Sequence, residues 1–215
     1  MKEIIVKVKP VGLLTVGWSH PSAMGVDIPF VKKPASANHP EQSYYIPASS
    51  FKGALRSSAS RVAQAYGFTS CGEVKPNLLE SDEKICDVCF LFGTVNRRKP
   101  IIYFSDLLPS KTQKPMTLLQ THTRIDDRSQ TVAEHGLFTV ESILPTVEFT
   151  GSIKYTDLGG RLPLLLLALA ELRLGRFGRR SLIDIRLEGV ERLRDEVDSK
   201  WMTLVNELGE WLWSA

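Results

Sequence analysis

Alternation of apolar and polar residues predicts the strands of this chain. Within residues 1–9, isoleucine and valine alternate with lysine, which is the two-residue period of a strand with one buried face. The same period recurs over residues 147–155 and 182–190. Residues 100–107 form another β-like run, and the first strand is expected to resume over residues 13–16. These patterns predict a sheet that has one solvated face.

A helical period appears in three other segments. The first runs over about residues 50–67 and ends at Gly67, a residue type that commonly follows the last turn of a helix. Its apolar stripe is formed by Phe51, Leu55, Val62 and Tyr66. A leucine-rich helix is expected from Leu162, and an amphipathic helix over residues 198–213. The last helix has acidic flanks, which disfavour a nucleic-acid contact. We expect it to pack on its own domain, and docking on a neighbouring subunit is the alternative.

The order of these elements predicts an α+β fold. Two helices would cover one face of an antiparallel sheet, in the ferredoxin-like arrangement that RNA-recognition modules share. Residues 1–215 are then a single domain with additions to this core. The additions are a long loop, a polar insertion with all the cysteines, a long β-hairpin with a polar tip, and a C-terminal helix, over residues 18–43, 69–95, 117–143 and 195–215.

Composition narrows the cellular setting more than the function. The 215 residues carry a net charge of +3, which is too small to indicate nucleic-acid binding unless the charge is concentrated. Three cysteines cannot form a disulfide framework, so we expect a reducing cytoplasm. The N-terminus has a strand pattern and no signal-peptide core. The apolar run over residues 162–174 is too short for a bilayer and includes Pro163 and Glu171, so no membrane contact is expected.

Basic residues are concentrated at the start of the first helix, in "IPASSFKGALR". Ser49 or Ser50 is a natural N-cap, and the free amide groups of a first helical turn attract anions. Lys52 and Arg56 are four residues apart and therefore share a helix face. A phosphate could meet hydroxyl, amide and ammonium groups there. Taken alone, the motif is more typical of a capped helix with solvated basic side chains.

A second basic site follows the leucine-rich helix, in "LRLGRFGRRS". Glycines permit close backbone approach to a ligand, arginines make two-pronged contacts with phosphate, and an aromatic ring can stack on a base. The residues concerned are Arg173, Gly175, Arg176, Phe177, Gly178, Arg179 and Arg180. An ordinary glycine-terminated helix with a solvated turn explains the segment equally well.

The cysteines have the spacing of a metal site. Cys86 and Cys89 form a C-x-x-C pair, and Cys71 precedes them in the same polar insertion. Thiolates at this spacing bind tetrahedral zinc, which would stabilise a segment with little apolar content. A fourth ligand could be any of His20, His39, His122 or His135. Free buried thiols are the alternative.

Four motifs together resemble the repeat-associated mysterious protein (RAMP) superfamily: "IPASSFKGALRSSASR", "CFLFG", "RIDDRSQTVAEHGLFTVESI" and "LGRFGRRSLIDI". More narrowly, they resemble the repeated backbone subunit of type III CRISPR interference complexes of the Csm or Cmr kind. The resemblance covers nearly all of residues 1–190. It implies a ferredoxin-like core that polymerises along a CRISPR guide RNA, with target RNA, other copies of the chain and other subunits of the complex as partners. It also implies a zinc site in some members.

The resemblance assigns roles to particular residues. Guide phosphates would be held by Ser49, Ser50, Lys52, Arg56, Gly175, Arg176, Gly178 and Arg179. The hairpin, with Arg124 and Arg128, would be a thumb that wedges into the guide–target duplex. In "SAMGVDIPFVKKP", Asp27 matches an aspartate that cuts target RNA through attack by a ribose 2′-hydroxyl, with a divalent cation such as Mg²⁺ or Mn²⁺. His20 lies in the same loop and could assist.

This chain departs from the family pattern at two places. Ala48 stands where a glycine is common, and Lys32 with Lys33 stands where a basic–acidic pair is common. These departures leave open whether the chain is the main repeated subunit or a diverged paralogue. Beside a cleaving backbone subunit, three alternatives stay open. They are a non-catalytic RNA-binding paralogue, a guide-processing endoribonuclease with a histidine base, and a zinc-stapled α+β domain that binds no RNA.

Overall fold

A computed structural model describes residues 1–18, 25–33, 43–72, 85–94, 101–111 and 116–213. Its central sheet is antiparallel, with β4, β8, β1 and β9 side by side in that order and β5 continuing the β4 edge of β8. Its strands are β1 (Lys2–Pro10), β4 (Ile102–Phe104), β5 (Leu108–Lys111), β8 (Glu148–Tyr155) and β9 (Ile183–Glu188). Strand, helix, two strands, helix and strand follow each other in the predicted ferredoxin-like order, so the α+β fold is confirmed.

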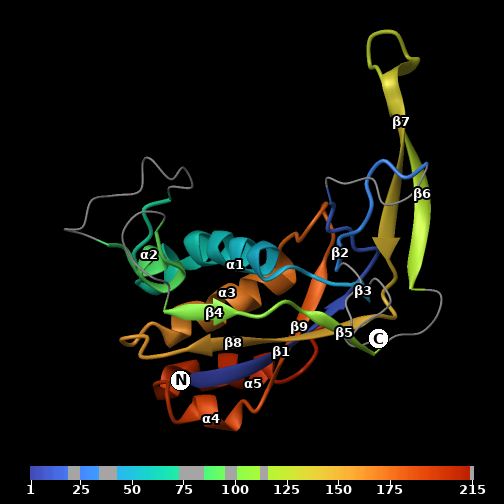
Figure 1. Ribbon diagram of the computed structural model, residues 1–215. Coiled ribbons are helices and arrows are strands. Elements are labelled where there is room, and N and C mark those ends of the chain that lie inside the picture. The colour runs from blue at the N-terminus through green and yellow to red at the C-terminus, as the bar shows by residue number, and fades with distance from the viewer. Residues whose placement is uncertain (19–24, 34–42, 73–84, 95–100, 112–115, 214–215) are drawn as a thin grey trace.

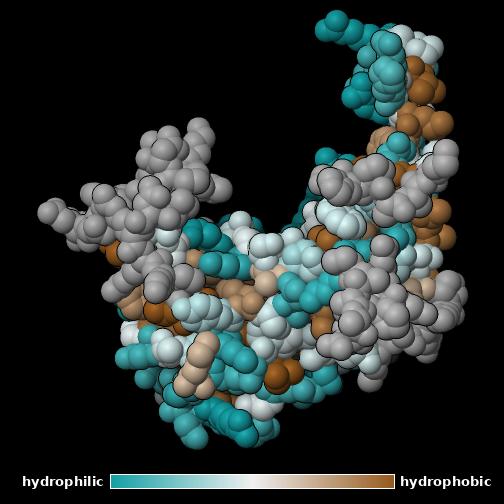
Figure 2. Space-filling model, viewed as in Figure 1, coloured by the Kyte–Doolittle hydropathy of each residue, from teal (hydrophilic) through white to brown (hydrophobic). Residues whose placement is uncertain are grey.

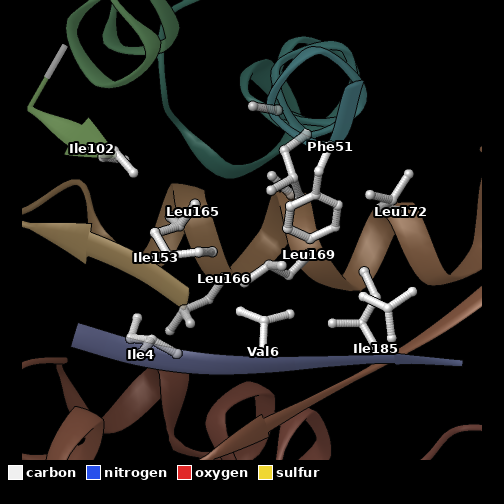
Figure 3. Close-up of a cluster of buried hydrophobic side chains, with 14 of the residues drawn as sticks. Ile4, Val6, Phe51, Ile102, Ile153, Leu165, Leu166, Leu169, Leu172 and Ile185 are labelled. Atoms are coloured by element: carbon white, nitrogen blue, oxygen red, sulfur yellow. The ribbon is translucent and has the colours of Figure 1, made fainter. Parts of the chain in front are cut away.

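Two helices cover one face of this sheet, α1 (Ala48–Val62) and α3 (Leu162–Leu174) (Figure 1). Both the alternation in β1 and the leucines of α3 direct apolar side chains into the space between them. In Figure 3, Val6 of β1 and Ile185 of β9 face Leu169 of α3 and Phe51 of α1. All four side chains are at most 2% exposed. This core fixes the positions of the segments that lead into and out of the sheet.

The remaining elements are appended to the core. They are β2 (Lys32–Lys33), β3 (Ser43–Tyr44), α2 (Asp87–Phe92), β6 (Thr117–Ile125), β7 (Val132–Ile143), α4 (Glu191–Arg194) and α5 (Met202–Leu208), with 3-10 turns at Gln64–Tyr66 and Ser199–Trp201. The strands β6 and β7 pair into a hairpin that projects from the body, while α2 lies near the opposite end of α1 (Figure 1). Among the described residues, no helix is long and apolar enough to span a bilayer.

Several predicted boundaries are wrong. The strand expected over residues 100–107 is shorter, because only Ile102–Phe104 of this range pairs with β8, and a separate strand, Leu108–Lys111, pairs with β8 beyond it. The hairpin turn is shorter than the polar tip suggested, because β7 already begins at Val132. Tyr66 belongs to a 3-10 turn and is 52% exposed, so it is not part of the apolar stripe of α1.

The C-terminal helix is shorter than predicted but packs on its own domain as expected. It ends at Leu208, and Val205 and Leu208 are its buried residues. Contacts with α3 and β9 hold α5 in place. Trp211 and Leu212, which the helical pattern included, lie beyond its end.

A buried ion pair joins this C-terminal segment to the core. The Arg173 guanidinium donates to Asp184 Oδ1 at 2.9 Å and to the carbonyls of Glu207 and Glu210 at 3.0 and 2.8 Å. Asp184 also accepts hydrogen bonds from the backbone amides of Ile185 and Trp213. Arg173 is only 3% exposed, so its expected membership of the basic site is wrong. Its charge is used within the fold.

We predict that Arg173→Met lowers the free energy of unfolding by about 3–5 kcal/mol, because it leaves the Asp184 carboxylate buried without its cation. The double variant R173M/D184N should recover part of that loss. Urea denaturation followed by tryptophan fluorescence measures both. Arg176→Met removes an exposed arginine of the adjoining loop and should change stability by less than about 0.5 kcal/mol. Equal losses of stability in R173M and R176M would contradict a structural role for the Arg173–Asp184 ion pair.

Candidate nucleic-acid interface

Parts of the two predicted basic sites line one cavity, Ser50 from the first site and Arg176 with Gly178 from the second. Ser50, Ser57 and Arg61 line it from α1, and Arg176 and Gly178 line it from the loop after α3, around a volume of about 340 Å³. Arg61 is already engaged, because its guanidinium donates to Glu171 Oε1 at 2.8 Å and to Ser58 Oγ at 2.9 Å. Within the described residues, Arg176 makes no ion pair. The cavity therefore offers hydroxyl groups and one uncompensated guanidinium.

Close backbone contact fixes the glycine-rich loop, which we define as residues 175–181. The amide of Arg179 donates to the Thr15 carbonyl at 2.9 Å, and Ser181 Oγ donates to the Leu13 carbonyl at 2.8 Å. Gly178 has φ +58°, and a Cβ there would lie 2.2 Å from the Thr15 carbonyl oxygen. Glycine is thus the residue that both this dihedral and this approach require.

Phe177 anchors the loop to the core. Its side chain is 3% exposed, and its ring lies edge-on to Phe51 of α1 with 6.4 Å between centroids. The expectation that Phe177 stacks on a base is therefore wrong, because the ring fills the core. The glycine-rich loop is therefore held by the contact between Phe177 and Phe51 and by its hydrogen bonds to residues 13–15.

A second, larger groove continues from Gly178 to the hairpin. It has a volume of about 830 Å³, and the surface is visibly hollowed between the hairpin and the body (Figure 2). Arg124 and His122 line it from β6, and Arg179 and Arg180 from the glycine-rich loop. No aspartate or glutamate is among its described lining residues. This concentration of positive charge suits a polyanion.

An aromatic pair on the hairpin lines the groove. His122 and Phe138 are cross-strand partners, and their rings stack with 5.5 Å between centroids and 23° between planes. Stacked rings beside arginines are a surface on which a nucleobase can lie. Sequence reasoning missed this pair. Alternation along the hairpin arms could have shown that both residues share the face that also carries Gln120 and Val140.

The hairpin pairing is irregular beside Arg124, which lines the groove on the same strand face as Gln120 and His122. The pairing of β6 with β7 shifts between Thr123 and Ile125, and His135 adopts φ 53° on the opposite strand. A Cβ on Gly136 would lie 2.8 Å from the carbonyl oxygen of Arg124, so the bulge needs glycine. Arg128 lies farther out, exposed in the turn of the hairpin.

Asp27 lies at the base of the hairpin. Its carboxylate Oδ2 accepts a hydrogen bond from the Thr139 amide at 2.7 Å, and the amides of Asp27 and Ile28 both donate to the Thr139 carbonyl at 3.0 Å. The side chain is exposed. These bonds place a carboxylate beside β7. His20, expected to assist, lies outside the described residues.

The lysines after Asp27 form anchors rather than a free basic patch. Lys32 pairs with Glu141 of β7 at 3.2 Å, and Glu141 also accepts hydrogen bonds from the Tyr44 hydroxyl and the Phe30 amide. Burial opposes the charge of Lys32, but Glu141 and Tyr44 outweigh it and raise the Lys32 pKa. Lys33 pairs with Asp106 at 2.9 Å. Both pairs hold the loop that carries Asp27.

The N-terminus of α1 differs from the prediction. The helix begins at Ala48 after Pro47, and no side chain caps it from within, so neither Ser49 nor Ser50 is the N-cap. Both serines lie in the first turn instead. Asp106 Oδ1 accepts the hydrogen bond of the Ala48 amide at 2.9 Å. Burial tends to raise the pKa of Asp106, but Lys33 and this amide lower it overall. One amide of the expected anion site is therefore already occupied.

Lys52 and Arg56 occupy another face of α1. The cavity is lined by Ser50, Ala54, Ser57 and Arg61, which follow helical spacing, and neither basic residue is among its described lining residues. Lys52 is half-buried, and burial together with the neighbouring Arg56 charge lowers its pKa. Arg56 donates to the Gly93 carbonyl at 2.7 Å and to Cys89 Sγ at 3.2 Å. It thus points toward α2.

The cysteines form a cluster that can hold a metal such as zinc. The sulfurs of Cys71, Cys86 and Cys89 lie within 4.8 Å of one another, and Cys71 and Cys89 are 3.6 Å apart. Ligand sulfurs around tetrahedral zinc lie about 3.8 Å apart, so the thiols fit. Burial, with the neighbouring thiols, raises the pKa of Cys89 to about 12. A metal must therefore displace a thiol proton to bind there.

Two of the four histidines that could supply a fourth ligand are excluded. His122 and His135 belong to the hairpin, whereas the cysteines belong to α2 and the segment before it, at the other side of the molecule (Figure 1). Neither histidine can complete the cluster of its own chain. His20 and His39 lie outside the described residues.

Comparison with protein families agrees with this geometry. The model of the RAMP superfamily matches residues 27–182. The chain therefore belongs to the RAMP superfamily, and this membership fits an RNA-binding role in CRISPR-associated systems. A comparison with curated proteins finds no significant match.

We predict that Gly178→Ala destabilises the protein by about 3 kcal/mol, because the new methyl group meets the Thr15 carbonyl in a dihedral region that side chains avoid. Gly160→Ala is the matched control. Gly160 has φ +77° but nothing within 4 Å of a Cβ, so its loss should be about 1 kcal/mol. Chemical denaturation measures both, and similar losses would show that the Thr15 contact is unimportant.

Proposed function

We propose that this RAMP protein is an RNA-binding backbone subunit of a type III CRISPR interference complex, which polymerises along the guide and cleaves complementary target RNA. One observation supports this most: Ser50 of α1 and the glycine-rich loop line a single cavity, which meets the hairpin groove at Gly178. Hydroxyl groups, loop arginines and an aromatic pair then follow one another along a continuous surface. A ribose-phosphate strand has the shape and charge for such a surface.

The guide backbone is proposed to run over the first turn of α1 and the glycine-rich loop. Ser49, Ser50 and Arg176 contact its phosphates, and Arg179 continues the contacts into the groove. Lys52 faces the adjoining side of α1 and contacts phosphate from there. Gly175 and Gly178 let the RNA backbone approach the loop closely. Base pairing with the target, rather than the protein, supplies sequence specificity.

The hairpin is proposed to be a thumb that wedges into the guide–target duplex, so that copies of the chain along the guide interrupt the duplex at regular intervals. Arg124 and Arg128 contact the displaced strands, and the unstacked base lies against the His122–Phe138 pair. Unstacking costs a few kcal/mol, and stacking on an aromatic ring offsets about 1–3 kcal/mol of this cost. The hairpin base is anchored through Glu141 and Lys32, so the wedge keeps its orientation.

Asp27 is proposed to act on the target at this wedge. The ribose 2′-oxygen gives up its proton and forms a bond to the adjacent phosphorus, and the bond from phosphorus to the 5′-oxygen breaks. The products are a 2′,3′-cyclic phosphate and a 5′-oxygen, which takes a proton from water to become the 5′-hydroxyl. Asp27 takes the proton or holds the divalent cation (Mg²⁺ or Mn²⁺) that this chemistry requires. Splaying of the strand by the hairpin favours the in-line geometry.

The cysteine cluster is proposed to hold a structural zinc ion. Cys71, Cys86 and Cys89 would provide three thiolates, and the fourth position is left to a residue or a water. The metal would fix α2 and the segment before it on the core.

A non-catalytic RNA-binding paralogue is the second candidate. The hydrogen bond from the Thr139 amide to Asp27 favours it, because this carboxylate already has a structural role in holding the loop on β7.

Replacing Asp27 separates the two candidates. We predict that Asp27→Asn, which keeps an oxygen for the Thr139 amide, leaves target binding unchanged but slows cleavage about 100-fold or more. Cleavage of labelled target by the assembled complex is the measurement. Asp198→Asn, at an exposed position near the C-terminal helix, is the control and should cut at the normal rate. Unchanged cleavage by the D27N complex would support the non-catalytic paralogue.

Binding through the groove should depend on salt. We predict that replacing both Arg179 and Arg180 by Gln weakens RNA binding and reduces the slope of log affinity against log salt by about 1–2. Filter binding at several salt concentrations measures this slope. Arg192→Gln removes an exposed arginine on α4 and should leave the slope unchanged. No salt-dependent retention of RNA by the unmodified protein would exclude an RNA-binding function.

A further inference from the structure

We propose that Arg56 is a positioning residue of the cysteine cluster, acting as the cationic partner of a metal–thiolate site, and that it makes no contact with RNA. This inference rests on the proposed metal, and it is independent of the proposed cleavage by Asp27. It gives a new role to a residue that the sequence motif places among the phosphate contacts.

The two terminal nitrogens of Arg56 both point at α2. Nη1 donates to the Gly93 carbonyl at 2.7 Å, just after the last turn of α2, and Nη2 donates to Cys89 Sγ at 3.2 Å. A planar guanidinium that makes two such bonds has a fixed orientation. Arg56 is half-buried and absent from the described lining of both basic cavities. Its charge is therefore committed to the cluster.

The cluster needs a cation of this kind once a metal is bound. Three thiolates around a divalent ion carry a net charge of −1 when the fourth ligand is neutral. Cys86 and Cys89 are buried, so this charge would be poorly solvated. A guanidinium bonded to Cys89 Sγ neutralises it and holds the sulfur in place, as hydrogen bonds to metal ligands generally do.

The backbone around the cluster also favours thiolates. The Cys89 amide donates to Cys86 Sγ at 3.4 Å, so Cys86 caps the N-terminus of α2 through its sulfur. Each of these two sulfurs thus accepts a hydrogen bond from a group with positive or partly positive charge. Arg56 supplies the only such bond that comes from α1 among the described residues. It links the metal site to the helix whose first turn lines the proposed RNA cavity.

Zinc affinity of the full-length protein tests the proposal. Competition with a chromogenic chelator gives the dissociation constant for zinc. We expect Arg56→Gln to weaken zinc binding about 10- to 100-fold. Arg56→Lys keeps the positive charge but loses the planar guanidinium that makes two hydrogen bonds at once, so it should give an intermediate loss of zinc affinity. Arg192→Gln is the control with the same change of charge on α4, and it should bind zinc as the unmodified protein does. Circular dichroism verifies that each variant is folded.

A second measurement distinguishes a role of Arg56 at the cysteine cluster from a contact between Arg56 and RNA. At saturating zinc, R56Q should bind RNA with unchanged affinity and an unchanged salt slope. Unchanged zinc affinity in R56Q would overturn the proposal, and so would a salt slope reduced by about one, which indicates a lost phosphate contact. An unmodified protein that binds no zinc would overturn it as well. A failure of the unmodified protein to bind RNA would instead count against the proposed function and leave the zinc result valid.

Discussion

Residues 13–16 hold the two halves of the candidate interface at a fixed separation. On one side, Leu14 exchanges backbone hydrogen bonds with Ile143 of β7, and the Thr15 hydroxyl lies 2.8 Å from the Ser142 hydroxyl. On the other side, the Thr15 carbonyl accepts the Arg179 amide. One short segment thus sets the width of the groove between hairpin and glycine-rich loop. Because backbone groups make most of these bonds, the width depends little on which side chains line the groove.

Local pattern was enough to predict the elements that build the core. The alternation in β1 and β8 and the leucines of α3 determine which faces are buried, and two helices packed on an antiparallel sheet bury those faces. The cysteine cluster also followed from spacing, because Cys86 and Cys89 are separated by one helical turn. Periodicity within one segment thus predicted which elements form the core, although it misplaced the ends of the first and last helices.

Packing between different segments determines the roles of several residues that could not be predicted from the local sequence. Arg173, Arg176 and Arg56 are alike in composition and lie in equally basic motifs, yet one is buried against Asp184, one is free in the cavity, and one is bonded to Cys89. Arg173 and Arg56 have partners in other elements, Asp184 of β9 and Cys89 of α2, whereas Arg176 makes no ion pair within the described residues. Phe177 is similar, because an aromatic residue between glycines is typical of a ligand contact until Phe51 packs against it. Helix caps depend equally on distant residues, since Asp106 rather than a serine holds the first amide of α1.

The arginines left in the groove have an energetic consequence. Arg124, Arg179 and Arg180 line one space without a carboxylate among its described residues, and like charges in such a space repel one another. Arg180 also adopts φ 64°, a dihedral that favours glycine over arginine. Stability alone would favour a glycine or a neutral residue at that position. An arginine held there despite strain and repulsion is explained if an anion occupies the groove, because the anion removes the repulsion when it binds.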